Sequence, residues 1–358
     1  MPDLKTILTT LADAFGPSGF EGEVRGIFRD LAGESAAIAY DNLGGIIARH
    51  AGTATAPRIL LAAHLDEVGL LVRGILPNGC LKVVPLGSWW PPALLAQRVL
   101  IRSRKGDLPG VVGAKPPHYM SEDEKTRQPK IGEFYIDVGS NGREETEAMG
   151  ILPGDPVVPA VQAVTMNHPD RMLGKAFDDR AGCAILLQVL RELDGNHPNQ
   201  VFGAGTVQEE VGARGARVIS RLVEPDLCLV LEGAPADDFP EAGSIIQGRV
   251  GGGPQIRRFD PSMMANQALV DLLIEEARAL SIPYQVAVRE GGGTDGSIIQ
   301  LETGGGVPTA VIGIPVRYAH SHQGIVSLSD LEAAVKLVKA VVYKLNAELV
   351  TRLKQNPW

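Results

Sequence analysis

The residues of this chain that could do chemistry are histidines and carboxylates at the edges of apolar runs. His64 and Asp66 follow the apolar run 59–63, and Glu209 and Glu210 follow the run 201–207. In open α/β sheets the chemistry collects where strands end, so these groups can converge in one crevice. Imidazoles and carboxylates without a thiolate are a ligand set for divalent metals that carry out hydrolysis. The pattern is completed by Asp178 before a helical pattern, Glu232 after 227–231, and His320 after 308–314.

The two short motifs each allow a plainer interpretation. In His64-Leu65-Asp66 both polar side chains point to the same side of a strand, which suits a metal-bound histidine oriented by a carboxylate, or simply a polar turn. Neighbouring residues such as Glu209 and Glu210 face different ways, so one can bind a metal while the other stays free as a base. Two adjacent acids on a surface are also common. The apolar strand before them and Val211-Gly212 after them favour a site.

The remaining three positions are also ambiguous when taken singly. Asp178 can cap a helix or bridge two metals. Glu232 ends an apolar strand, where a carboxylate needs a partner or a metal. His320 cannot be separated from His322 by spacing alone. Taken in order, three carboxylates and two histidines can hold two metal ions with one carboxylate bridging.

The composition is that of an ordinary globular protein. The chain has 358 residues, 44% of them hydrophobic and 21% charged, enough for two domains or one domain with a large insertion. A net charge of −8 argues against a nucleic-acid partner. There is no signal-peptide pattern, and no apolar stretch approaches the roughly 20 residues that cross a bilayer. The three cysteines form no metal-type pair, so we expect small buried residues in a cytoplasmic protein.

Helical and strand patterns alternate at both ends of the chain and stop in the middle. Residues 70–161 are strand-like, with turn signals and no long helix, and the charged stretch 122–130 is expected to be a loop. We therefore predict an α/β domain, residues 1–69 plus 162–358, interrupted by an all-β module, residues 70–161. Two helices are expected late in the chain, at 262–280 and from a capping box at Ser329 and Glu332 to about 353.

Six segments together resemble the M42 family of metallo-aminopeptidases, which includes glutamyl aminopeptidases and the tetrahedral self-compartmentalising (TET) peptidases. The resemblance extends over essentially the whole chain. It implies a mixed central sheet flanked by helices, and an inserted PDZ-like or barrel module for dimerisation. The segments are 16–19, 63–69, 174–180, 208–212, 292–295 and 315–321.

The resemblance also implies a role for each matching residue. Glu209 resembles the general base, and Asp66 would orient a histidine ligand. The glycine-rich loop 291–295 would lie near the substrate, with Thr294 and Asp295 as binding residues. The implied metal ligands are Asp178 as the bridge, His64 and Glu232 for one ion, and Glu210 and His320 for the other.

The cofactors and partners follow from the same resemblance. Two divalent ions per chain are expected, zinc first, with cobalt or manganese as alternatives. The expected substrates are peptides with a free N-terminus. Self-association through the inserted module would build dimers and from them a homododecamer, with no membrane partner. His322 falls where relatives often have proline, and it is not assigned as a ligand.

Three other function classes remain open from the residues alone. The nearest is another dinuclear amide hydrolase on the same core, such as a deacylase or dipeptidase. A glycoside hydrolase with paired acids would leave the histidines without a role, and the 5% aromatic content offers few surfaces for sugar stacking. A metal-free assembly protein would not need all five ligand positions filled.

Overall fold

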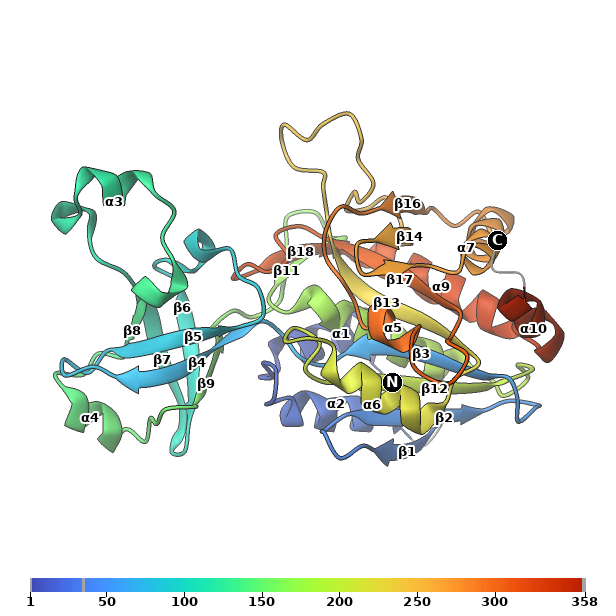
Figure 1. The fold of residues 1–358 in the computed structure, drawn as a ribbon, viewed down its shortest axis with the longest axis horizontal. Coiled ribbons are helices and arrows are strands. Elements are labelled where there is room, and N and C mark those ends of the chain that lie inside the picture. Colours follow the sequence, from blue (N-terminus) through green and yellow to red (C-terminus); the bar gives the residue numbers. More distant parts are fainter. Residues whose placement is uncertain (1, 34–35, 356–358) are drawn as a thin grey trace.

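The chain forms a large α/β part and a smaller β-barrel at its side (Figure 1). The structure is a computed structural model that describes residues 2–33 and 36–355. Within those ranges no helix is both long and apolar enough to cross a membrane. The prediction of a mixed sheet flanked by helices, with an all-β module set into it, is confirmed.

A mixed sheet forms the centre of the α/β part. Strands β12, β3, β13 and β17 are parallel neighbours in that order, and antiparallel pairs extend the sheet on both sides. The strand order within the described residues is β1 (Ala37–Tyr40), β2 (Ile46–Ala51), β12 (Gln200–Thr206), β3 (Arg58–His64), β13 (Leu227–Pro235), β17 (Thr309–Val316), β14 (Gln255–Asp260) and β15 (Met263–Met264), with β16 (Gln285–Val288) paired to β14.

The parallel strands place the chemical residues at one edge of the sheet. Strand β3 is buried along nearly its whole length, as expected for a continuous apolar run covered on both faces. Its last residue, His64, lies beside Thr206 at the end of β12. Glu232 lies in β13 opposite Gly313 of β17. The segments that follow these strands therefore enter the same crevice, as the topology of open α/β sheets predicts.

Helices cover the sheet. The central helix, α5, packs across β3 and β13 and also contacts α1, α2 and α9, whereas α6 and α8 contact each other and the sheet separately. The helix bounds in this part are α1 (Leu4–Asp13), α2 (Gly22–Ala32), α5 (Phe177–Glu192), α6 (Arg214–Val223), α7 (Gln267–Ala279), α8 (Gly296–Ile299), α9 (Leu328–Lys344) and α10 (Ala347–Gln355).

The barrel has a hydrophobic core of its own. Leu81, Ile101, Phe134 and Ile136 belong to this core and are nearly or fully buried. The barrel strands, in hydrogen-bonded order, are β4 (Gly69–Ile75), β5 (Leu81–Leu86), β8 (Tyr135–Asp137), β7 (Gly106–Gly113), β6 (Arg98–Ser103) and β9 (Pro156–Pro159), with short helices α3 (Glu122–Thr126) and α4 (Arg143–Ala148) outside them.

A small antiparallel sheet lies where the chain returns from the barrel. Strand β11 pairs with β10 on one side and with β18 on the other. Strand β18 directly precedes α9, so this sheet connects the return from the barrel to the last part of the chain. Its strands are β10 (Val164–Thr165), β11 (Arg171–Gly174) and β18 (Gly324–Ser327).

Four local predictions are wrong. The helix expected at 262–280 begins only at Gln267, because the Asn266 side chain caps it by accepting from the N–H of Leu269 at 2.9 Å, while Met263–Met264 pair with β14. The last helix is two helices. Asn199 donates to the carbonyls of Val342 and Leu345 at the end of α9, which satisfies groups that would otherwise continue the helix.

The other differences are small. Ser329 does not form the expected capping box: α9 begins at Leu328, and the Ser329 N–H donates to Asp170 at 2.8 Å. The charged stretch 122–130 contains the short helix α3, which does begin with a capping box between Ser121 and Glu124.

Candidate metal centre

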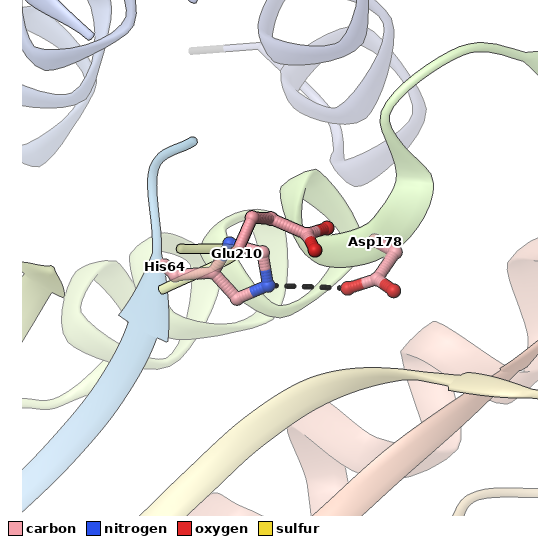
Figure 2. Close-up of side chains that lie close together, drawn as sticks. All are labelled: His64, Asp178 and Glu210. Carbon is pink, nitrogen blue, oxygen red and sulfur yellow. Dashed lines mark hydrogen bonds and ion pairs between the residues drawn. The ribbon is translucent and has the colours of Figure 1, made fainter. Parts of the chain in front are cut away.

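Asp178 lies between two histidines that come from distant parts of the chain. One carboxylate oxygen, Oδ1, is 3.1 Å from Nε2 of His64, and the other, Oδ2, is 3.3 Å from Nε2 of His320. A carboxylate whose two oxygens face two separate histidines has the arrangement needed to bridge two cations. Figure 2 shows Asp178 approaching His64 at the end of β3, with Glu210 beside them.

Two further carboxylates complete the cluster. Glu232 Oε1 lies 3.3 Å from Nε2 of His64, and Glu210 Oε1 lies 3.3 Å from Nε2 of His320. Glu210 Oε1 and Glu232 Oε2 are buried and accept no hydrogen bond. A buried carboxylate oxygen without a donor is costly unless a cation binds it. The donor set and these two oxygens therefore fit divalent metal ions.

His64 is held in the tautomer that a metal ligand needs. Its Nδ1 lies 3.0 Å from the backbone carbonyl of Asp66, which can only accept, so Nδ1 carries the hydrogen. Nε2 of the neutral ring is then free to coordinate, and it faces Asp178 and Glu232. The hydrogen bond made by the ring nitrogen that does not bind the metal fixes the orientation of a histidine ligand in this way.

The electrostatics of the metal-free cluster are those of closely packed opposite charges. Burial opposes the charged form of His320, but Asp178 and Glu210 raise its pKa to about 11. For His64, too, burial is outweighed by Asp178, Asp66 and Glu232, and its pKa lies well above the usual value. Burial raises the pKa of Glu232 to about 7. A cation bound here would compete with the protons of these groups.

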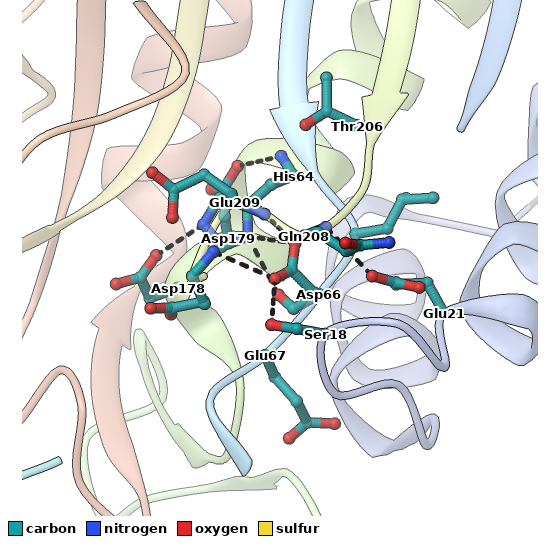
Figure 3. A network of polar contacts seen from close by, with 12 residues as sticks. Ser18, Glu21, His64, Asp66, Glu67, Asp178, Asp179, Thr206, Gln208 and Glu209 are labelled. Atoms are coloured by element: carbon teal, nitrogen blue, oxygen red, sulfur yellow. Dashed lines mark hydrogen bonds and ion pairs between the residues drawn. The ribbon is translucent and has the colours of Figure 1, made fainter. Parts of the chain in front are cut away.

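Asp66 joins the histidine to the neighbouring acidic pair. Its Oδ1 accepts from the N–H of Glu209 at 2.9 Å, and its Oδ2 accepts from the N–H of Glu210 at 3.1 Å and from the Ser18 hydroxyl at 2.6 Å. Its carboxylate lies 3.5 Å from Nδ1 of His64, further than the backbone carbonyl. Figure 3 shows Asp66 at the centre of this network. Asp66 therefore positions the main chain of the Glu-Glu pair as well as the histidine.

Glu209 faces a cavity next to the cluster. The cavity has a volume of about 440 Å³, and Asp178, Glu210, Glu232 and His320 also line it. Burial raises the pKa of Glu209 well above its usual value, and nearby carboxylates add to the shift. A carboxylate with a raised pKa beside a set of metal ligands has the properties of a general base.

The two expected substrate-binding residues differ in position. Thr294 lines the cavity, together with the glycines 291–293. Asp295 is not among the described residues that line it. Its Oδ2 instead accepts from the hydroxyl of Thr206 behind the cavity, and its Oδ1 is buried without a hydrogen bond. Burial raises the pKa of Asp295 to about 6.

The pattern of strand-end acids did not reveal several residues of the site. Arg257 and Arg289 line the cavity from β14 and the segment after β16, and Ser88 reaches it from the barrel. Strand β14 was not predicted, which is why its arginine was missed. Asp179 also lies beside His64 and Glu232, but its oxygens accept from the N–H groups of His64 and Gly182. Asp179 lies in the first turn of α5, where its Oδ1 accepts from the N–H of Gly182 at 3.0 Å.

Comparison with known proteins identifies the family of this chain. Residues 44–337 match the peptidase family described as M42 glutamyl aminopeptidase. The glutamyl aminopeptidase of Lactococcus lactis subsp. cremoris is 35% identical over 350 residues, which cover 96% of this chain and 97% of that protein. The chain belongs to the M42 family of aminopeptidases, and it is a peptide hydrolase.

Solved structures show the same fold over nearly the whole chain. A TET aminopeptidase from a marine sediment archaeon, Thaumarchaeota archaeon SCGC AB-539-E09, has a TM-score of 0.95 and 39% identity, covering 98% of this chain and 99% of its own. The TET1 peptidase of Pyrococcus horikoshii has a TM-score of 0.85 and 30% identity, covering 96% and 100%. That peptidase is described as assembling into a tetrahedron or a large octahedral shell.

Proposed function

We propose that this protein is a dinuclear metal-dependent aminopeptidase that releases N-terminal residues from peptides. The observation that carries the proposal is the position of Asp178, with its two oxygens facing His64 and His320. His64 and Glu232 would hold one ion, and Glu210 and His320 the other. Zinc suits this donor set, and cobalt or manganese would also be accepted.

The protein's own residues would divide the chemistry as follows. When bound, the two ions would polarise the scissile carbonyl and lower the pKa of the attacking water. Glu209 takes a proton from that water and returns it to the leaving amine. Asp66 keeps Glu209 and Glu210 in place through their main-chain N–H groups. Thr294 and the glycines beside it form the cavity wall next to the substrate.

The charge of the cavity supports a preference for an acidic N-terminal side chain. Two divalent ions would balance the negative charge of the four carboxylates that line the cavity. The positive charges of Arg257 and Arg289 would then remain. Arg257 pairs with Asp260 at 3.0 Å, and its buried Nε has no partner. Arg289 donates to the carbonyl of Pro235, and no carboxylate among the described residues pairs with it. A carboxylate on the substrate side chain would form bidentate contacts with the guanidinium group of Arg289.

Assembly and location belong to the same proposal. The barrel, within the predicted domain 70–161, would mediate dimerisation, and dimers would build a homododecamer like the tetrahedral shell described for the archaeal TET1 peptidase. The protein would act in the cytoplasm. Size measurement by light scattering tests the assembly directly: twelve chains per particle are expected, and a monomer would contradict it.

Metal stoichiometry tests the bridging arrangement. Wild-type protein, stripped with a chelator and reloaded with zinc, is expected to bind two ions per chain. Asp178→Ala should lose both ions, since it removes a ligand from each, whereas Glu232→Ala should lose one. Two ions retained in Asp178→Ala would contradict a bridge. Two ions bound without release of N-terminal residues would instead favour a related deacylase or dipeptidase.

A further inference from the structure

The loop that carries His320 has an unusual backbone. It connects β17 to β18, and Arg317 and Ile325 close it with two backbone hydrogen bonds of 3.0 and 3.1 Å. Within it, Tyr318 has φ 62° and His320 has φ 57°. Residues other than glycine are uncommon in this left-handed region, and they persist only where surrounding contacts hold them. The position of His320 therefore depends on what anchors this loop.

One anchor comes from the barrel. His322 is only 6% exposed, and its Nε2 lies 2.7 Å from the backbone carbonyl of Arg98 at the start of β6. A carbonyl can only accept, so Nε2 of His322 is the donor. The same carbonyl accepts from the N–H of Ala160, just after β9, where the chain leaves the barrel. His322 thus ties the His320 loop to the segment where the chain enters and leaves the barrel.

A second ligand of the same ion also contacts the barrel. Gly87, just after β5, has φ 78°, and a Cβ built on it would lie 3.1 Å from Oε2 of Glu210. The barrel backbone therefore packs against Glu210 on one side of the site and holds the His320 loop on the other. His64 and Glu232, by contrast, lie within β3 and β13 of the central sheet.

We propose that His322 is a positioning residue through which the barrel holds His320 at the metal site that His320 forms with Asp178 and Glu210. This inference rests on the proposed metal centre. It makes the two ions unequal: the ion of His320 depends on contact with the barrel, and the ion of His64 and Glu232 does not. His322 itself is not assigned as a ligand, because it does not line the cavity at the metal cluster, whereas His320 does.

The test is a set of zinc affinities measured by competition with a chromophoric chelator. His322→Phe keeps the ring size but removes the donor, and one of the two dissociation constants should rise about tenfold, the lower end for residues that orient a ligand. The zinc-binding step that weakens in His322→Phe must be the one that His320→Ala abolishes. His322→Gln should restore the affinity because its amide nitrogen can reach the position of Nε2, whereas the shorter His322→Asn should not. His118→Phe, at an exposed histidine of the barrel, is the matched control and should leave both constants unchanged.

Several results would overturn this inference. One is wild-type affinity for both ions in His322→Phe; another is equal weakening of both steps together with a lower melting temperature of the metal-free protein, which marks a general structural role. Should His322→Phe fail to fold, the difference between the Gln and Asn variants decides, and equal affinities in these two would contradict the proposal. A wild-type protein that binds no zinc would refute the metal centre itself, a result distinct from all of these.

Discussion

Replacing Glu209 with glutamine isolates the proposed proton transfer. The N–H of residue 209 donates to Asp66 at 2.9 Å, and that main-chain bond does not depend on the side chain. Glutamine also has nearly the same volume, so the cavity and the metal ligands should keep their places. Only the ability to accept a proton is lost. General base catalysis contributes about 10²–10⁴-fold, so kcat/KM should fall by that factor, or about 3–5 kcal/mol in the activation free energy.

The assay combines kinetics with metal content. Steady-state hydrolysis of aminoacyl p-nitroanilides gives kcat/KM, and elemental analysis of the same sample gives ions per chain. Glu144→Gln, an exposed glutamate of the barrel, is the control and should match wild type in both. Glu209 is not the general base if Glu209→Gln with a full complement of metal retains activity within about fivefold of wild type. Loss of metal in this variant would assign Glu209 to the ligands instead.

Three further perturbations test separate parts of the structure. Asp66→Ala removes the acceptor for two N–H groups and the Ser18 hydroxyl. Metal affinity should therefore fall about 10–100-fold, and the free energy of unfolding by about 1–3 kcal/mol. Unchanged metal affinity in chelator competition would contradict the positioning role of Asp66. Arg289→Gln should lower kcat/KM for a glutamyl anilide about 10–100-fold, which is the range of a hydrogen bond to a charged group. The kcat/KM for a leucyl anilide should not change. Equal losses for the two substrates would show that Arg289 does not recognise the acidic side chain. Burial, with a smaller contribution from His197, lowers the pKa of His50. The unfolded chain therefore takes up a proton that the folded protein does not, so stability is present above the unfolded pKa of about 6.5 and is lost as pH falls below it. The melting temperature of metal-free His50→Asn should depend less on pH between about 7.5 and 5.5 than that of wild type, and equal slopes would contradict this.

The strands that carry the site were predictable because their sequences are unambiguous. A continuous apolar run such as 59–63 can only be a buried strand or helix, and its length favours a strand. His64 and Glu232 come from two such strands, and the structure brings them to 3.3 Å. Because these strands are parallel, their carboxyl ends lie at the same edge of the sheet. The boundaries of the two predicted domains and the roles of the ligands stay predictions.

The features that the sequence did not reveal depend on contacts between distant segments. The stretch 262–280 has helical spacing throughout, yet its start is set by pairing of Met263–Met264 with β14 and by the Asn266 cap. The split between α9 and α10 depends on Asn199, about 140 residues away. Arg289 gives no local signal, because an arginine after a short strand is ordinarily solvated. Its place in the cavity follows only from the assembled fold.

We propose that this chain removes N-terminal residues with the help of bound metal. The most direct measurement is hydrolysis of a panel of unblocked aminoacyl p-nitroanilides by chelator-stripped protein reloaded with zinc, cobalt or manganese. An anilide carries no carboxylate except that of its side chain, so the same panel tests the acidic preference. We expect cleavage only after metal is restored, fastest with glutamyl or aspartyl substrates, and none of their N-acetylated forms. Cleavage of acetylated substrates, or equal activity without metal, would contradict a metal-dependent aminopeptidase.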